Sequence, residues 1–224
     1  MYILIFIVFM GLSLLIGQVL KSKFRKYSQV PVNLGLTGRD VALKMLRENG
    51  IYDVQVVCVE GQLTDHYNPQ TKTVNLSTEV YSQSNISAAA VAAHECGHAI
   101  QHAQAYSFLQ MRSALVPVVS FASNWIQWVL LAGVLLVNTF PGLLLAGIVL
   151  FALTTLFSFI TLPVEIDASR RAIGWLSNAG ITTYETNDYA KDALKWAAYT
   201  YVVAALASLA TLLYYISIFT GRRD

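Results

Sequence analysis

The chain has 224 residues, of which 12% are charged and 55% are hydrophobic, and its formal net charge is +2. Soluble domains carry about 25% charged residues, so this composition excludes a disordered chain and argues against a simple water-soluble globule. A net charge of this size does not indicate a basic surface that binds nucleic acid, so we expect no nucleic-acid partner.

The first predicted element is the uncharged apolar run 2–20, which is long enough to cross about 30 Å of hydrocarbon as a helix. A cleaved signal peptide would place basic residues before such a run, whereas here they follow it. These residues are Lys21, Lys23, Arg25 and Lys26. The pattern therefore favours a membrane anchor over a signal peptide.

A small α+β module is predicted after the anchor. Thr37-Gly38-Arg39-Asp40 has capping-box character and opens a short helix through Asn49. Two β-like runs, 54–58 and 73–77, lie on either side of the turn-rich stretch 66–70. We expect these runs to form a hairpin or a short sheet.

Three further membrane spans are predicted in the second half of the chain. Residues 113–164 hold no charged side chain, and Asn138–Gly142 supplies a turn near the middle. This pattern predicts a transmembrane hairpin with spans at about 114–137 and 142–162, and a last span at about 197–219. The predicted fold class is therefore a mainly α membrane protein with about four transmembrane helices and a small α+β module.

Four spans place both termini on one face of the membrane and the polar segments 21–112 and 163–196 on the other. These segments carry all of the Lys and Arg residues except Arg222 and Arg223. The positive-inside rule therefore predicts that the polar segments are cytoplasmic. We expect the chain to form a single membrane-embedded domain, 1–224, with the lipid bilayer as one of its partners.

The sequence His94-Glu95-Cys96-Gly97-His98 is an HExxH pattern, on a helix that we expect to begin at the alanine run 88–90 with Ser87 as its cap. Spacing by four residues puts both imidazoles on one helical face, so two nitrogens can reach one zinc ion. Glu95 stands beside them and can take a proton from a zinc-activated water as general base. The competing interpretation is a surface helix whose polar residues are unrelated.

A catalytic zinc site needs a third protein ligand and one open position. His102 lies eight residues after His94, which is about 12 Å along a straight helix, so it is a candidate for supporting the site and not for binding the metal. His66 lies in a predicted turn and is interpreted as a surface residue.

The favoured third ligand is Glu165, which follows the third span together with Asp167 at the start of a predicted polar helix, 163–172. Carboxylates this close to the hydrocarbon are costly unless they are paired or coordinated. Asp167 can pair with Arg170 or Arg171 at helical spacing, and a helix N-terminus would favour both acids. The arginine partners explain the position of Asp167 and leave Glu165 without such a partner. We therefore expect Glu165 to bind the metal.

The segment AAAVAAHECGHAIQHA, followed by LPVEIDASRRA after a membrane hairpin, resembles the YugP-like membrane zinc metallopeptidases and, more distantly, the HtpX and CAAX-prenyl-protease group. The resemblance covers nearly the whole chain and implies one Zn²⁺, with His94, His98 and Glu165 as ligands and Glu95 as catalytic base. It also implies a bacterial-type plasma membrane and, through HtpX, membrane protein quality control. This chain has Ser169 where the HtpX-type motif has an aspartate. The role of that aspartate in supporting the metal ligands is therefore taken by Ser169 or by Asp167, or it is absent.

These observations predict an integral-membrane zinc endopeptidase that acts on a peptide or protein substrate associated with the membrane. Its small α+β module is expected to be a zincin-like catalytic module that carries the HExxH helix. An extended substrate could pair with the strand edge near Val74–Ser77. Five side chains are candidates for stabilising the oxyanion: Tyr67, Tyr106, Arg170, Arg171 and Tyr189. The alternative is a non-catalytic, zinc-stabilised scaffold or adaptor, which would need His66 or Cys96 as a fourth ligand.

Overall fold

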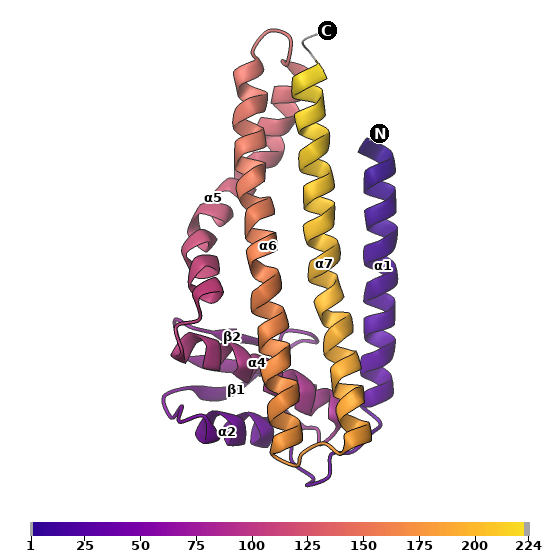
Figure 1. The fold of residues 1–224 in the computed structure, drawn as a ribbon, viewed down its shortest axis with the longest axis vertical. Coiled ribbons are helices and arrows are strands. Elements are labelled where there is room, and N and C mark those ends of the chain that lie inside the picture. The colour runs from indigo at the N-terminus through magenta and orange to yellow at the C-terminus, as the bar shows by residue number, and fades with distance from the viewer. Residues whose placement is uncertain (1, 222–224) are drawn as a thin grey trace. The chain divides into compact units, whose positions relative to one another are not determined.

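The computed structural model describes residues 2–221, and most of them are helical (Figure 1). In chain order the elements are α1 (Tyr2–Tyr27), α2 (Gly38–Glu48), β1 (Gln55–Val59), β2 (His66–Asn68), β3 (Thr73–Ser77), α3 (Thr78–Ser82), α4 (Ile86–Ala103), α5 (Ser107–Leu135), α6 (Pro141–Asn178) and α7 (Tyr184–Thr220). Within the described range the contacts define two compact units. The first comprises residues 2–15, 110–163 and 200–221, and the second comprises 16–109 and 164–199.

Four helices are long and apolar enough to cross a membrane: α1, α5, α6 and α7. Three of the predicted spans lie inside helices, and the span 114–137 runs two residues past the end of α5 at Leu135. Together with the small sheet, these helices confirm the predicted fold class.

The first unit is held together by close helix packing. Gly133 of α5 lies against α6, where an added Cβ would come within 2.6 Å of the Leu144 Cα. The Thr155 and Ser208 hydroxyls are 2.7 Å apart and join α6 to α7. Small and hydroxyl residues of this kind let helices approach and bond where no hydrophobic gain from water is available.

The second unit contains a three-stranded sheet in the order β1-β3-β2. β1 runs parallel to β3 from Gln55↔Thr73 to Val59↔Ser77, and β2 pairs antiparallel with β3. His66–Asn68, expected to be a turn, is therefore an edge strand. The expectation of a substrate edge at Val74–Ser77 is wrong, because β3 is the central strand, with β1 along its whole length on one side and β2 along Thr73–Asn75 on the other.

The helix α2 confirms the predicted capping box: the Thr37 side chain accepts from the Asp40 N–H, and the Asp40 carboxylate accepts from the Thr37 N–H. The apolar face of α2 is buried in the same core as the alanine-rich half of α4. The cap of α4 differs from expectation: the Asn85 side chain accepts from the Ala88 N–H, and the helix begins at Ile86. Asn85 replaces Ser87 in this role because it is the last extended residue before the helix.

The separate polar helix predicted at 163–172 is wrong. Figure 1 shows α6 and α7 as unbroken helices, and Pro163 lies inside α6. Unbroken helices keep backbone groups satisfied near lipid, and a single proline is tolerated in such helices. Glu165 and Asp167 are therefore mid-helix residues, and a helix N-terminus does not account for either acid.

Gly97, inside the HExxH pattern, sets how closely α4 and α6 approach. A Cβ at this position would lie 2.7 Å from the Ala168 carbonyl oxygen.

We therefore expect Gly97→Ala to lower the free energy of unfolding by about 1–3 kcal/mol, although alanine favours helices. Thermal unfolding of the purified protein measures this change. Gly174→Ala on α6, where a Cβ meets nothing within 4 Å, is the matched control and is expected to be neutral or stabilising. Equal stability of the two variants would contradict the packing argument.

Candidate metal centre

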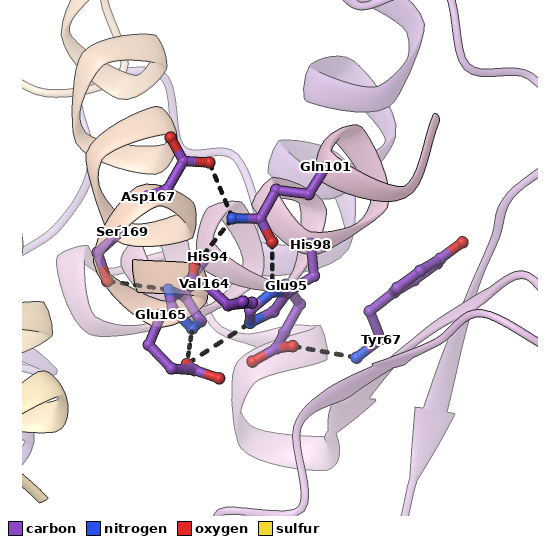
Figure 2. Close-up of polar contacts among 9 residues, drawn as sticks. All are labelled: Tyr67, His94, Glu95, His98, Gln101, Val164, Glu165, Asp167 and Ser169. Atoms are coloured by element: carbon purple, nitrogen blue, oxygen red, sulfur yellow. Dashed lines mark hydrogen bonds and ion pairs between the residues drawn. The ribbon is translucent and has the colours of Figure 1, made fainter. Parts of the chain in front are cut away.

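The centre of the second unit brings together side chains from α4 and α6. Spacing by one helical turn places His94 and His98 on the same face of α4, and their rings meet edge to face with centroids 4.8 Å apart. Their Nε2 atoms lie 3.3 Å and 3.6 Å from Glu165 Oε2 (Figure 2). The three side chains therefore converge on one point although 71 residues separate His94 from Glu165.

The geometry of this group fits a zinc ion. One ligand atom from each of the three residues lies within 4.8 Å of the other two. Donors about 2 Å from a tetrahedral zinc are about 3.3 Å from one another, close to the two nitrogen-to-oxygen distances observed. Two imidazoles and one carboxylate are a known set of ligands for catalytic zinc. All three side chains are at least 85% buried.

The charges at the site also suit a cation. Burial lowers the pKa of His98, but the hydrogen bond and negative charge of Glu165 outweigh this effect, and the net pKa of His98 is raised. The carboxylate of Glu165 thus attracts positive charge to the point where the two Nε2 atoms meet. A bound metal cation would supply that charge directly.

The outer ring nitrogens of both histidines have partners that orient them. His94 Nδ1 lies 3.1 Å from the Ser169 hydroxyl, and His98 Nδ1 lies 3.1 Å from Gln101 Oε1. A proton on each Nδ1 leaves each Nε2 lone pair free for a metal. Ser169, a candidate from the sequence, thus contacts a proposed ligand.

Gln101 was missed by the sequence analysis. Its side chain is fully buried, and its amide NH₂ donates to the Val164 carbonyl and to Asp167 Oδ2, both at 2.8 Å (Figure 2). Gln101 therefore links His98 on α4 to the turn of α6 that carries Glu165. The available signal was a glutamine three residues after His98, on the same helical face as the motif.

We expect Gln101→Leu to weaken zinc binding by about 10- to 100-fold, because the substitution keeps the volume but removes the hydrogen bonds that orient His98 and α6. Competition with a chromophoric chelator measures the affinity. Gln110→Leu, at an exposed position of α5, is the control and should bind zinc as the wild type does. Unchanged affinity in Gln101→Leu would show that this network does not orient the ligands.

Glu95 lies beside the three ligand candidates and does not belong to their group. Its Oε2 accepts a hydrogen bond of 3.0 Å from the Tyr67 backbone N–H on β2 (Figure 2). The Tyr67 hydroxyl in turn lies 2.8 Å from His102 Nδ1. The carboxylate of Glu95 is thus held between the motif helix and the outer edge of the sheet.

The remaining candidates lie around the centre. Asp167 accepts from Arg171 Nε at 2.5 Å and from Gln101, so the structure places Glu165, and not Asp167, with the histidines. His102 and Arg170 are exposed, and His66 is an exposed residue whose Nδ1 lies near the Thr64 carbonyl.

Cys96 points away from the centre. Its thiol donates to the Ala42 carbonyl in the core between α4 and α2. Burial raises the pKa of this thiol, which keeps it in the neutral form that binds metals poorly. Cys96 therefore does not supply the fourth ligand of a closed site.

The comparisons with known proteins agree with this geometry. Residues 2–220 match the profile of a family described as "Putative neutral zinc metallopeptidase". The chain is 42% identical over 224 residues to a protein of Bacillus subtilis (strain 168) named "Putative membrane protease YugP", and the match covers 100% of this chain and 99% of that protein. No solved structure matches the chain. The chain belongs to this YugP-like family, and it is an integral membrane protein.

Proposed function

We propose that this protein is a zinc-dependent integral-membrane endopeptidase. In this proposal His94, His98 and Glu165 hold one Zn²⁺ per chain, and Glu95 is the general base. The observation that carries the proposal is the convergence of two Nε2 atoms and one carboxylate oxygen beside a fourth, hydrogen-bonded carboxylate.

The mechanism follows from the positions of the side chains. Zinc, when bound, supplies a Lewis acid that polarises the scissile carbonyl and lowers the pKa of water. Glu95 takes the proton from the attacking water at its carboxylate and later passes it to the leaving amine. The Tyr67 N–H keeps this carboxylate aimed at the site, and Ser169 and Gln101 keep the two imidazoles in one orientation.

The substrate is proposed to lie along the outer edge of β2. The Tyr67 N–H points away from β3 and toward Glu95, so this edge borders the general base. Since the Tyr67 N–H is held by Glu95, an extended peptide along this edge donates its own backbone N–H to the Tyr67 carbonyl, which makes recognition broad in sequence. Broad recognition suits a role in membrane protein quality control.

A catalytic role fits the donor set better than a structural one. Among residues 2–221, the group contains three metal-ligating side chains, one fewer than a closed structural zinc site uses. The open position is available to water and substrate.

The proposed topology has four membrane crossings with the catalytic segments in the cytoplasm. The support is the distribution of basic residues along the chain, which favours the polar segments as the cytoplasmic side. The contrasting pair, Arg222 and Arg223, lies outside the residues that the structure describes.

Metal removal tests the function directly. Dialysis of the detergent-purified protein against a chelator should abolish cleavage of a mixed quenched-peptide library, and one equivalent of Zn²⁺ should restore it, because the three ligands provide a single site. A metal-free protein that still cleaves, or a zinc-loaded protein that cleaves nothing in the library, would contradict the proposal.

A further inference from the structure

A groove of about 470 Å³ lies in the second unit, between the last turns of α1 and the first half of α4. We propose that this groove binds an extended segment of the substrate polypeptide and selects one that carries an acidic side chain among apolar neighbours. This inference rests on the proposed peptidase function and names the class of substrate.

The groove shares α4 with the proposed general base. Ala88 and Val91 of α4 line it, and Glu95 follows Val91 by one helical turn, about 6 Å, on the same face. Asp65 lines the groove from the sheet side, two residues before Tyr67, whose N–H holds Glu95. A chain that pairs with β2 next to Glu95 therefore runs into this groove as it continues past Asp65.

Two cations and two carboxylates line the groove, and both carboxylates already accept hydrogen bonds. The Asp65 carboxylate is occupied by the Ser77 N–H and hydroxyl, at 2.7 Å and 3.1 Å. The carboxylate of Glu79 accepts from the Gln62 amide at 3.1 Å. Lys21 and Arg25 line the α1 wall, are exposed, and make no side-chain hydrogen bond or ion pair within the part of the chain that the structure describes. These two cations remain free to pair with an acidic group on a ligand.

The rest of the lining suits a peptide better than a lipid headgroup. Phe24, Leu63 and Val91 offer apolar surface. Polar side chains that can bond a peptide backbone, the Gln83 amide NH₂ and the Ser87 hydroxyl, also line the groove. An anionic headgroup would use only the two cations, whereas an extended chain uses all three kinds of lining.

The position of the groove along α1 indicates where such a segment comes from. Leu20, the last residue of the uncharged run 2–20, lines the groove together with Lys21, the first charged residue of the chain. This is the level at which α1 leaves the hydrocarbon. We therefore infer that the bound segment belongs to a membrane-anchored polypeptide and lies next to the bilayer.

Charge reversal tests the inference. Purified full-length protein is given quenched peptides that are identical except for Glu or Lys at one position, with each position near the scissile bond tested in turn. The wild type should prefer Glu at one or two positions by about tenfold in kcat/KM, the effect of two exposed ion pairs. Lys21→Glu/Arg25→Glu should abolish or reverse this preference and keep its zinc. The matched control is Lys26→Glu, an exposed residue of α1 outside the groove, and it should behave as the wild type does.

Binding of a fluorescent peptide to Glu95→Gln gives a second measurement that does not depend on turnover. The preferred Glu peptide should bind about tenfold more weakly when Lys21→Glu/Arg25→Glu is added. A preference that survives the double reversal would overturn the inference and leave the peptidase function standing. Inhibition by anionic phosphatidylglycerol vesicles that requires Lys21 and Arg25, without any peptide preference, would overturn it in favour of a lipid site. A zinc-loaded wild type that cleaves no peptide would overturn the peptidase function itself.

Discussion

Glu95→Gln is expected to lower kcat by about 100- to 10,000-fold, because the amide cannot take the proton from the attacking water. The substitution keeps the size of the side chain, and its carbonyl oxygen can still accept the hydrogen bond from the Tyr67 N–H. The substitution leaves the proposed ligands, His94, His98 and Glu165, in place. Initial rates of peptide cleavage by zinc-loaded wild type and variant measure the loss.

Zinc content and thermal unfolding are the controls for Glu95→Gln, and both should match the wild type. This combination separates a catalytic carboxylate from a structural one. Cleavage at the wild-type rate would show that Glu95 is not the general base. A variant that lost zinc together with activity would instead place Glu95 among the ligands.

The second large effect is expected at Glu165. Replacement by alanine removes the only carboxylate among the three converging donors. Wild-type protein is expected to hold roughly one zinc per chain, and purified Glu165→Ala should retain almost none. Removing this buried carboxylate also leaves His94 and His98 without the partner that draws them together. Atomic absorption on protein in detergent measures the ratio of metal to chain.

Asp167→Ala is the matched control, since the two acids are neighbours on α6 and differ in their partners. Asp167 contacts Arg171 and Gln101 and no ligand atom, so its loss should leave zinc bound, at weaker affinity. Zinc retained in Glu165→Ala and lost in Asp167→Ala would reverse the assignment of the third ligand. A zinc content that neither substitution changes would contradict a metal centre formed by α4 and α6.

Local patterns were sufficient to predict much of this protein. The long uncharged runs predicted four membrane helices, and the Thr37–Asp40 cap and the strand 73–77 were predicted at their observed positions. The HExxH spacing placed His94 and His98 on one face because helical periodicity is a property of the backbone itself. Each of these features depends on residues within a few positions of one another, so the sequence contains all the information needed.

Other predictions failed where a local residue preference was overridden by the lipid environment or by pairing with a distant segment. A new polar helix was predicted to begin at Pro163, yet α6 continues through this residue, because backbone groups near lipid have no better partner than the helix. His66–Asn68 was interpreted as a turn, yet the backbone pairs with Thr73–Asn75 of β3. Strand pairing depends on a partner that periodicity along one segment does not reveal.

The metal centre was likewise predicted in part from local patterns and in part decided by tertiary contacts. The residue types and spacing of His94, Glu95, His98 and Glu165 were sufficient to propose a zinc centre from the sequence alone. Only the tertiary structure decided that Gln101 and Ser169 contact the outer nitrogens of the two histidines, and that β2 supplies an N–H to Glu95. These contacts join α4 to residues on α6 and β2 that are distant in the sequence. Their existence depends on how α4 packs, at Gly97, against Ala168, and no local pattern encodes that approach.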